Sequence, residues 1–121
     1  RELTGDPTGH AEVVALRHGS RIMKSWRLEA STLYVTLEPC CMCAGALVNA
    51  RVSRIVFGTF DPKAGATGSL LNICQDARLN HNLDVVSGIL IEPCSAILKS
   101  FVRSRRAELK KKKLRSRQIC E

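Results

Sequence analysis

The sequence predicts an α/β protein with a three-layer α/β/α arrangement, because strand-like and helix-like segments alternate along it. Short apolar runs rich in β-branched residues occupy 32–37, 54–58 and 83–86, and each has the length of a buried strand. With 121 residues, 45% of them hydrophobic, the chain can bury the core of one domain. In such a sheet, ligands are expected at the ends of the strands.

The first expected element is a helix. Asp6 is predicted to be its N-cap and Pro7 its first helical residue, and the helix runs toward about Trp26. The strand TLYVTL at 32–37 follows. Because Trp26 and Tyr34 lie in a predicted helix and a predicted strand, we expect their rings to pack against the protein.

The remaining elements continue the alternation. A second helix is expected from Met42 to about Ala50, and the second strand follows it. A glycine-rich loop at 61–68 then lies at the carboxyl end of that strand. After the third strand, a long helix is expected from about Glu92 onward.

Two short clusters hold side chains that bind metals. His10 is followed two residues later by Glu12, while Cys40 and Cys43 follow Pro39 directly. A helix that begins after the proline places both sulfurs on one side, and its N-terminus lowers their thiol pKa values. One imidazole and two thiolates can hold Zn²⁺ with the fourth position open to water. Glu12, rotated by about 200° from His10 on a helix, would stay outside the ligand shell and move protons.

The combined pattern H-x-E and P-C-x-x-C is the signature of zinc-dependent deaminases. It predicts the hydrolytic replacement of an exocyclic amino group of a base by oxygen. Cys41 is predicted to be a core or outer residue and not a fourth ligand, because it points about 100° away from Cys40 on a helix. Three alternatives stay open: a deaminase of free bases or nucleotides, a catalytically silent RNA-binding subunit, and a structural zinc module with a fourth protein ligand.

The positive charge is concentrated at the C-terminal end. Residues 1–98 hold nine Lys or Arg and nine Asp or Glu, whereas residues 99–121 hold ten and two, which accounts for the net charge of +8. Steps of four and three place six cations on one helical stripe about 27 Å long: Lys99, Arg103, Arg106, Lys110, Lys113 and Arg117. The stripe favours a polyanionic substrate such as RNA. A solvated helix with a frayed basic tail is the alternative for 110–117.

Cysteine usage and hydropathy indicate the compartment. The chain has six cysteines, of which the metal site uses two, while Cys74, Cys94 and Cys120 are scattered. Without a signal peptide or an apolar run long enough to span a bilayer, a reduced cytoplasmic chain with no membrane partner is expected. Dimerisation would help a chain of this size.

The sequence resembles the bacterial tRNA-specific adenosine deaminases, which are themselves among the enzymes that define the signature. The resemblance is carried by DPTGHAE at 6–12, TLYVTLEPCCMCAGA at 32–46, VFG at 56–58, Asp61, GSL at 68–70, NH at 80–81 and the basic final helix. It implies the conversion of adenosine to inosine at the wobble position of a tRNA anticodon by a homodimer with one zinc ion per subunit.

The resemblance also implies roles for single residues. It makes His10, Cys40 and Cys43 the zinc ligands and Glu12 the proton shuttle. The implied substrate contacts are Ala11 through its backbone, Asp61 at the target ribose, Lys63 nearby, and Phe101, Arg105 and Arg106 near the anticodon loop. The implied fold is a cytidine-deaminase-like sheet, apparently without the family's N-terminal helix and first two strands. Residues 1–105 would form this incomplete deaminase domain, and 106–121 a basic helix end or tail.

Overall fold

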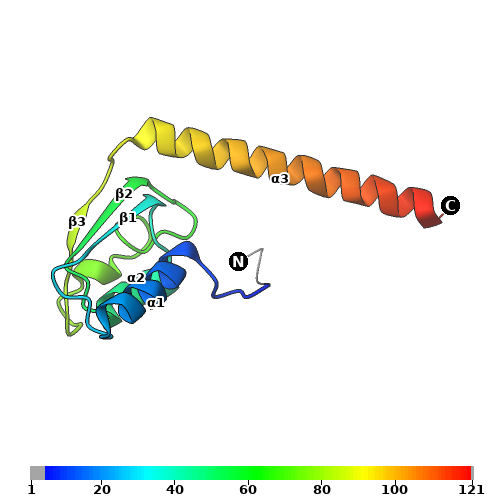
Figure 1. The fold of residues 1–121 in the computed structure, drawn as a ribbon. Coiled ribbons are helices and arrows are strands. Elements are labelled where there is room, and N and C mark those ends of the chain that lie inside the picture. Colours follow the sequence, from blue (N-terminus) through cyan, green and yellow to red (C-terminus); the bar gives the residue numbers. More distant parts are fainter. Residues whose placement is uncertain (1–4, 121) are drawn as a thin grey trace.

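The computed structural model describes residues 5–120, with side chains to residue 117. Its helices are α1 (Ala11–Met23), α2 (Cys41–Asn49), the short 3-10 helix η1 (Ile73–Gln75) and α3 (Ile91–Cys120); its strands are β1 (Thr32–Leu37), β2 (Arg54–Thr59) and β3 (Asp84–Val86). The strands form a parallel sheet in the order β1-β2-β3. Helices α1 and α2 lie on one side of the sheet and α3 on the other, as Figure 1 shows, which confirms the predicted α/β/α arrangement.

The core lies between the sheet and the α1–α2 layer. Parallel register aligns Leu33 with Ile55 and Ile55 with Val85, so these side chains share one face of the sheet. The buried core residues are Leu16, Leu28, Ala44, Leu47, Val48, Val52, Ile55, Phe57, Ala66, Cys74 and Leu83. The core is therefore formed chiefly by α2, by β2 and by the segments that follow them.

The opposite face of the sheet is more open, and the predicted packing of two aromatic rings is wrong. Tyr34 is 76% exposed, because the alternation along β1 turns it away from the core. Trp26 is 58% exposed and lies beyond the end of α1. Its ring instead contacts the guanidinium groups of Arg27 and Arg51, at 5.0 and 5.8 Å from the ring centroid.

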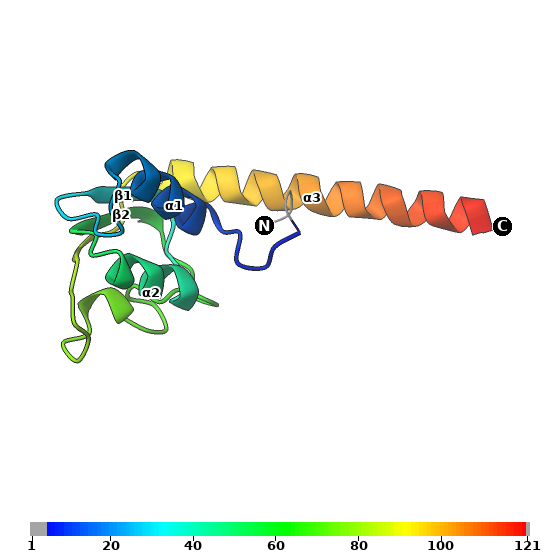
Figure 2. The ribbon, with the colours of Figure 1, turned by 60° about the horizontal axis from the view of Figure 1, so that its bottom comes forward.

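Gly58 of β2 leaves room for the start of helix α3 against the sheet. A Cβ on Gly58 of β2 would overlap the sulfur of Cys94, so the missing side chain lets the first turn of α3 approach the strand. The helix has 30 residues, a length of about 45 Å. As Figures 1 and 2 show, only its beginning covers the sheet, and its C-terminal part extends past the rest of the molecule.

Both metal-bearing helices begin at positions that differ from the prediction. Asp6 is not an N-cap: its Oδ1 accepts hydrogen bonds from the amide and hydroxyl of Thr8 at 2.8 and 2.7 Å, which forms a turn. The N-cap of α1 is His10, and α1 ends at Met23, where Lys24 adopts a left-handed conformation, and not at Trp26. Helix α2 begins one residue earlier than predicted, with Cys40 as N-cap.

The cysteines whose side chains are described are free thiols, and Cys120 lies outside that set. Between residues 5 and 120, no helix is both long and apolar enough to cross a membrane.

Candidate metal centre and active site

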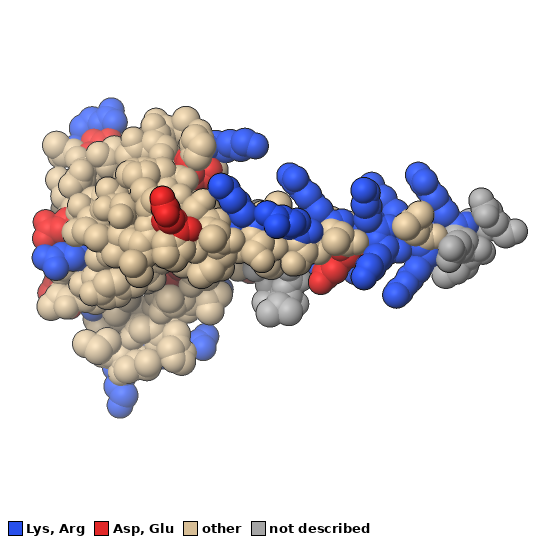
Figure 3. All heavy atoms as spheres, turned by 90° about the horizontal axis from the view of Figure 1, so that it is seen from above, with Lys and Arg blue, Asp and Glu red and all other residues tan. Residues whose placement is uncertain are grey.

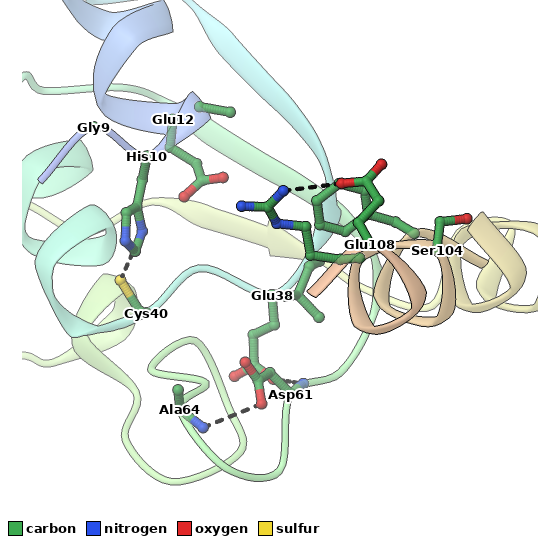
Figure 4. A pocket seen from close by; sticks show the side chains of 13 residues that line it. Gly9, His10, Glu12, Glu38, Cys40, Asp61, Ala64, Ser104 and Glu108 are labelled. Atoms are coloured by element: carbon green, nitrogen blue, oxygen red, sulfur yellow. Dashed lines mark hydrogen bonds and ion pairs between the residues drawn. The ribbon is translucent and has the colours of Figure 1, made fainter. Parts of the chain in front are cut away.

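The three predicted metal ligands meet at the N-termini of two helices. His10 is the N-cap of α1, Cys40 is the N-cap of α2, and Cys43 lies in the first turn of α2. The Nδ1 atom of His10 lies 3.6 Å from the Sγ of Cys40 and 3.5 Å from the Sγ of Cys43. Figure 4 shows the His10 ring directed at Cys40. The sequence prediction that these residues form one cluster is confirmed.

The distances fit a tetrahedral zinc site. A Zn–S bond of about 2.3 Å and a Zn–N bond of about 2.05 Å at the tetrahedral angle separate nitrogen from sulfur by about 3.6 Å. The two observed separations agree with that value. Over the described side chains the cluster includes no fourth ligand, and Cys41 is exposed. The donor set therefore suits a zinc ion with one open coordination position.

Glu12 lies beside this cluster without joining it. It is the second residue of α1, and Figure 4 shows its carboxylate directed into the space next to His10. Burial, then the Glu12 carboxylate and the Cys40 thiol, raise the pKa of the Cys43 thiol above its ordinary range. In the absence of a cation, burial and the nearby carboxylate therefore act against the lowering expected from the helix N-terminus. A bound cation would compensate that charge and favour the thiolate.

A cavity of about 830 Å³ opens at the cluster. Its walls come from the start of α1, the end of β1, the loop after β2 and one face of α3. The lining residues are Gly9, His10, Ala11, Glu12, Leu37, Glu38, Cys40, Asp61, Ala64, Phe101, Ser104, Arg105 and Glu108. A volume of this size accommodates a nucleoside.

The structure separates the predicted substrate residues into two groups. Ala11, Asp61, Phe101 and Arg105 line the cavity with the metal cluster. Lys63 and Arg106 do not line it. The amide of Lys63 donates a hydrogen bond to Asp61, while Arg106 lies with Lys99 and Arg103 along a separate shallow depression on α3.

Three polar residues of the cavity wall were not predicted from the sequence: Glu38, Ser104 and Glu108. Glu108 forms an ion pair with Arg105, with 3.0 Å between Oε2 and Nη1. Positions 101, 104, 105 and 108 follow the i, i+3, i+4, i+7 pattern of one helix face, which is a signal that sequence alone contains. Glu38 stands directly before the Pro-Cys pair, and its position at the end of a strand was the available signal.

Glu38 is a buried carboxylate with a complete set of hydrogen bonds. It is 2% exposed, and it accepts from the amides of Asp61, Thr67 and Ser69, each at 3.0 Å, and from the Ser69 hydroxyl. Burial acts to raise the pKa of this carboxyl group, but the hydrogen bonds from Ser69, Asp61 and Thr67 outweigh burial and lower it.

The basic residues of α3 lie on a continuous helix. Figure 3 shows Lys and Arg side chains spaced along its length beyond the rest of the molecule. Lys99, Arg103 and Arg106 share one depression, as the predicted stripe requires. Because α3 continues to Cys120, the distal part of the stripe belongs to the same helix.

A family model for MafB19-like deaminases matches residues 1–106 of the sequence. The chain belongs to the MafB19-like deaminase family. It is 52% identical over 108 residues to a tRNA-specific adenosine deaminase of Haemophilus influenzae, a match that covers 89% of this chain and 62% of that protein. To the protein of the same description from Bacillus subtilis it is 49% identical over 117 residues, which covers 97% and 70%. This family member thus spans about three fifths of the length of the Haemophilus protein.

Solved structures agree with the family assignment. A structure from a study of A-to-I editing by tRNA:A34 deaminases at the wobble position of transfer RNA superposes with a TM-score of 0.74 and 40% identity, and covers 80% of this chain and 70% of that one. A guanine deaminase from Nitrosomonas europaea superposes with a TM-score of 0.65 and 21% identity, and covers 78% and 57%. The second likeness concerns the fold alone. Both confirm the cytidine-deaminase-like α/β fold.

Proposed function

We propose that the chain carries the centre of a zinc-dependent hydrolase that converts adenosine to inosine at the wobble position of a tRNA anticodon. The observation that supports this most strongly is the cluster of His10, Cys40 and Cys43 with tetrahedral N–S separations on the wall of a nucleoside-sized cavity. The likeness to two tRNA-specific adenosine deaminases at 49–52% identity supports the choice of substrate.

Different residues of the chain would bind the metal and transfer protons. His10, Cys40 and Cys43 would hold the zinc ion, which when bound lowers the pKa of coordinated water so that a hydroxide nucleophile is available at neutral pH. Glu12 faces the same cavity and would accept a proton from the attacking water and deliver it to the ring nitrogen. It would then accept the proton of the newly added hydroxyl and pass it to the amino group, which leaves as ammonia. Because the carboxylate accepts each proton and the resulting carboxylic acid donates it, one residue would carry out both transfers.

The cavity wall and α3 would bind the RNA. The target nucleotide of an unpaired anticodon loop leaves its stack at low cost and enters the cavity. Asp61 and the backbone of Ala11 line the cavity where ribose and base would lie, and Phe101 and Arg105 approach from α3. Lys63 and Arg106 lie outside the cavity wall, so any RNA contact of theirs would be with nucleotides beside the target.

Several observations weigh against the alternatives. The absence of a fourth ligand among the described side chains disfavours a structural zinc module. Glu12 on the cavity wall disfavours a catalytically silent subunit. The likeness to guanine deaminase is one of fold, so it does not favour a free base as substrate. We further propose a cytoplasmic homodimer, a deaminase domain over 1–105 and a basic RNA-contacting segment over 106–121.

In the deciding experiment, the zinc-loaded chain is incubated with an anticodon stem-loop whose anticodon is ACG. In parallel it is incubated with adenosine, cytidine and guanine, and deamination of each is measured. Inosine in the stem-loop, with the three small molecules unchanged, is the expected result. Deamination of cytidine or guanine with an unchanged stem-loop would replace the proposed substrate. No deamination of any of the four would overturn the proposed activity.

A further inference from the structure

We propose that Glu38 is a positioning residue that fixes the loop 61–69 against the metal-binding segment and so places Asp61 in the substrate cavity. This inference rests on the proposed function, because it assigns the loop a part in binding the substrate of that site. Glu38 supplies no ligand atom to the metal cluster, which consists of His10, Cys40 and Cys43. Its role would be to hold the loop 61–69 in position through hydrogen bonds.

Four hydrogen bonds from the loop converge on the Glu38 carboxylate. Oε1 accepts from the amide of Asp61 and the hydroxyl of Ser69, and Oε2 accepts from the amides of Thr67 and Ser69. Both ends of the loop are thus tied to the same side chain. Since Glu38 is almost fully buried, water does not compete for these donors.

The backbone of the loop docks on the same segment. The amide of Ala66 donates to the carbonyl of Pro39 at 2.9 Å, and Gly65 forms an antiparallel bridge with Cys40. A Cβ on Gly65 would overlap the Glu38 carboxyl group, so the glycine is what lets the loop reach the carboxylate. The loop therefore rests directly on the residue that supplies a metal ligand.

Asp61 is both hydrogen-bonded to Glu38 and part of the cavity wall. Its amide is held by Glu38 at 3.0 Å, and its Oδ1 accepts from the amides of Lys63 and Ala64 at 3.0 and 3.2 Å. Figure 4 shows Glu38, Asp61 and Ala64 together below the metal ligands. Asp61 and Ala64 both line the cavity, so a shift of this loop would move the cavity wall and leave the metal ligands in place.

The chemistry requires a carboxylate at this position. Four donors converge on two oxygens, and an amide in place of the carboxylate would turn an NH₂ group toward N–H donors. Glu38→Gln keeps the size of the side chain but leaves at least one of these donors without an acceptor. Glu38→Ala removes every acceptor.

The experiment uses the full zinc-loaded chain with Glu38→Gln, and Glu29→Gln as control. Glu29 is an exposed acid paired with Arg27 at the surface, so its variant removes the same charge elsewhere. Three quantities are measured: zinc per chain, amide hydrogen exchange at positions 61, 67 and 69, and kcat and KM for the stem-loop. In Glu38→Gln we expect full zinc content, roughly 10- to 100-fold faster exchange at the three amides, and a KM raised about tenfold with kcat within about threefold. The control should match the wild type.

The outcomes separate the inference from the function on which it rests. Unchanged KM and unchanged exchange in Glu38→Gln would overturn the role of Glu38, as would a loss of zinc with KM unchanged. A wild-type chain that forms no inosine would instead overturn the proposed function. Should Glu38→Gln fail to fold, Ser69→Ala removes a single hydroxyl donor from the same carboxylate, and a rise in KM at full zinc content is then required.

Discussion

The Nδ1 atom of His10 lies 3.5 Å from the Sγ of Cys43, although 33 residues separate them in the sequence. Two helix N-termini bring them together, because His10 caps α1 and Cys43 lies in the first turn of α2. Packing of the two helices against one core therefore assembles the metal centre.

Zinc content should distinguish Cys40 from the cysteine beside it. Cys40→Ser removes a cluster ligand and should reduce bound zinc from about one to well below one equivalent per chain. Cys41→Ser is the matched control, since Cys41 is exposed and outside the cluster, and it should keep a full equivalent. Metal analysis after gel filtration makes the measurement. Equal zinc in both variants would contradict the ligand assignment.

Glu12→Ala should keep zinc and lose turnover. The carboxylate lies outside the ligand cluster, so its removal leaves the metal bound, whereas proton transfer by such a group contributes about 10²- to 10⁴-fold to the rate. The measurement is single-turnover formation of inosine at saturating enzyme, with Glu29→Ala as control. An active Glu12→Ala chain would remove Glu12 from the mechanism.

Two pairs of lysines on α3 should differ in their effect on RNA binding. Lys110 and Lys113 belong to the predicted stripe, whereas Lys111 and Lys112 lie off it on the same helix. Changing the stripe pair to Gln should weaken stem-loop binding and reduce the slope of log K against log salt by about 1.4, which is 0.7 for each lost contact to a single strand. The off-stripe pair should change the slope by less than half as much. Equal effects of the two pairs would refute the stripe.

The loop before β3 should lose stability at low pH. Hydrogen bonds from the Arg78 side chain and amide lower the pKa of Asp76 to about 2 from an ordinary value of 3.8. A carboxyl group with a lowered folded-state pKa stabilises the fold above its unfolded pKa and loses that contribution as the pH falls through its folded pKa. Asp76→Asn should therefore cost more stability at pH 5 than at pH 2, measured by urea unfolding. A cost independent of pH would contradict this.

The metal ligands could be predicted from sequence because residue type and spacing encode them. His10, Cys40 and Cys43 were predicted from the spacing within each cluster, the chemistry of zinc and the known signature that joins H-x-E to P-C-x-x-C. The start of α1 could not be placed, since Asp6 prefers a local turn with Thr8 and the helix begins at His10. Tyr34 was misplaced because the alternation along a strand does not say which of its two faces a neighbour covers.

The role of Glu38 could not be predicted from the sequence. Its donors lie 23 to 31 residues away along the chain, and only the docking of the 61–69 loop on Pro39 and Cys40 brings them to it. Apart from the position of Glu38 at the end of a strand, tertiary contacts of that kind leave no local pattern in the sequence. The face of α3 that lines the cavity could have been predicted from its helical spacing, but the prediction selected Phe101 and Arg105 and missed Ser104 and Glu108.

X-ray absorption at the zinc edge of the metal-loaded chain identifies the atoms bound to the metal. We expect a coordination shell of two sulfurs at about 2.3 Å, one nitrogen at about 2.0 Å and one light atom from solvent. A shell closed by a third or fourth sulfur, or a chain that binds no zinc, would contradict this expectation.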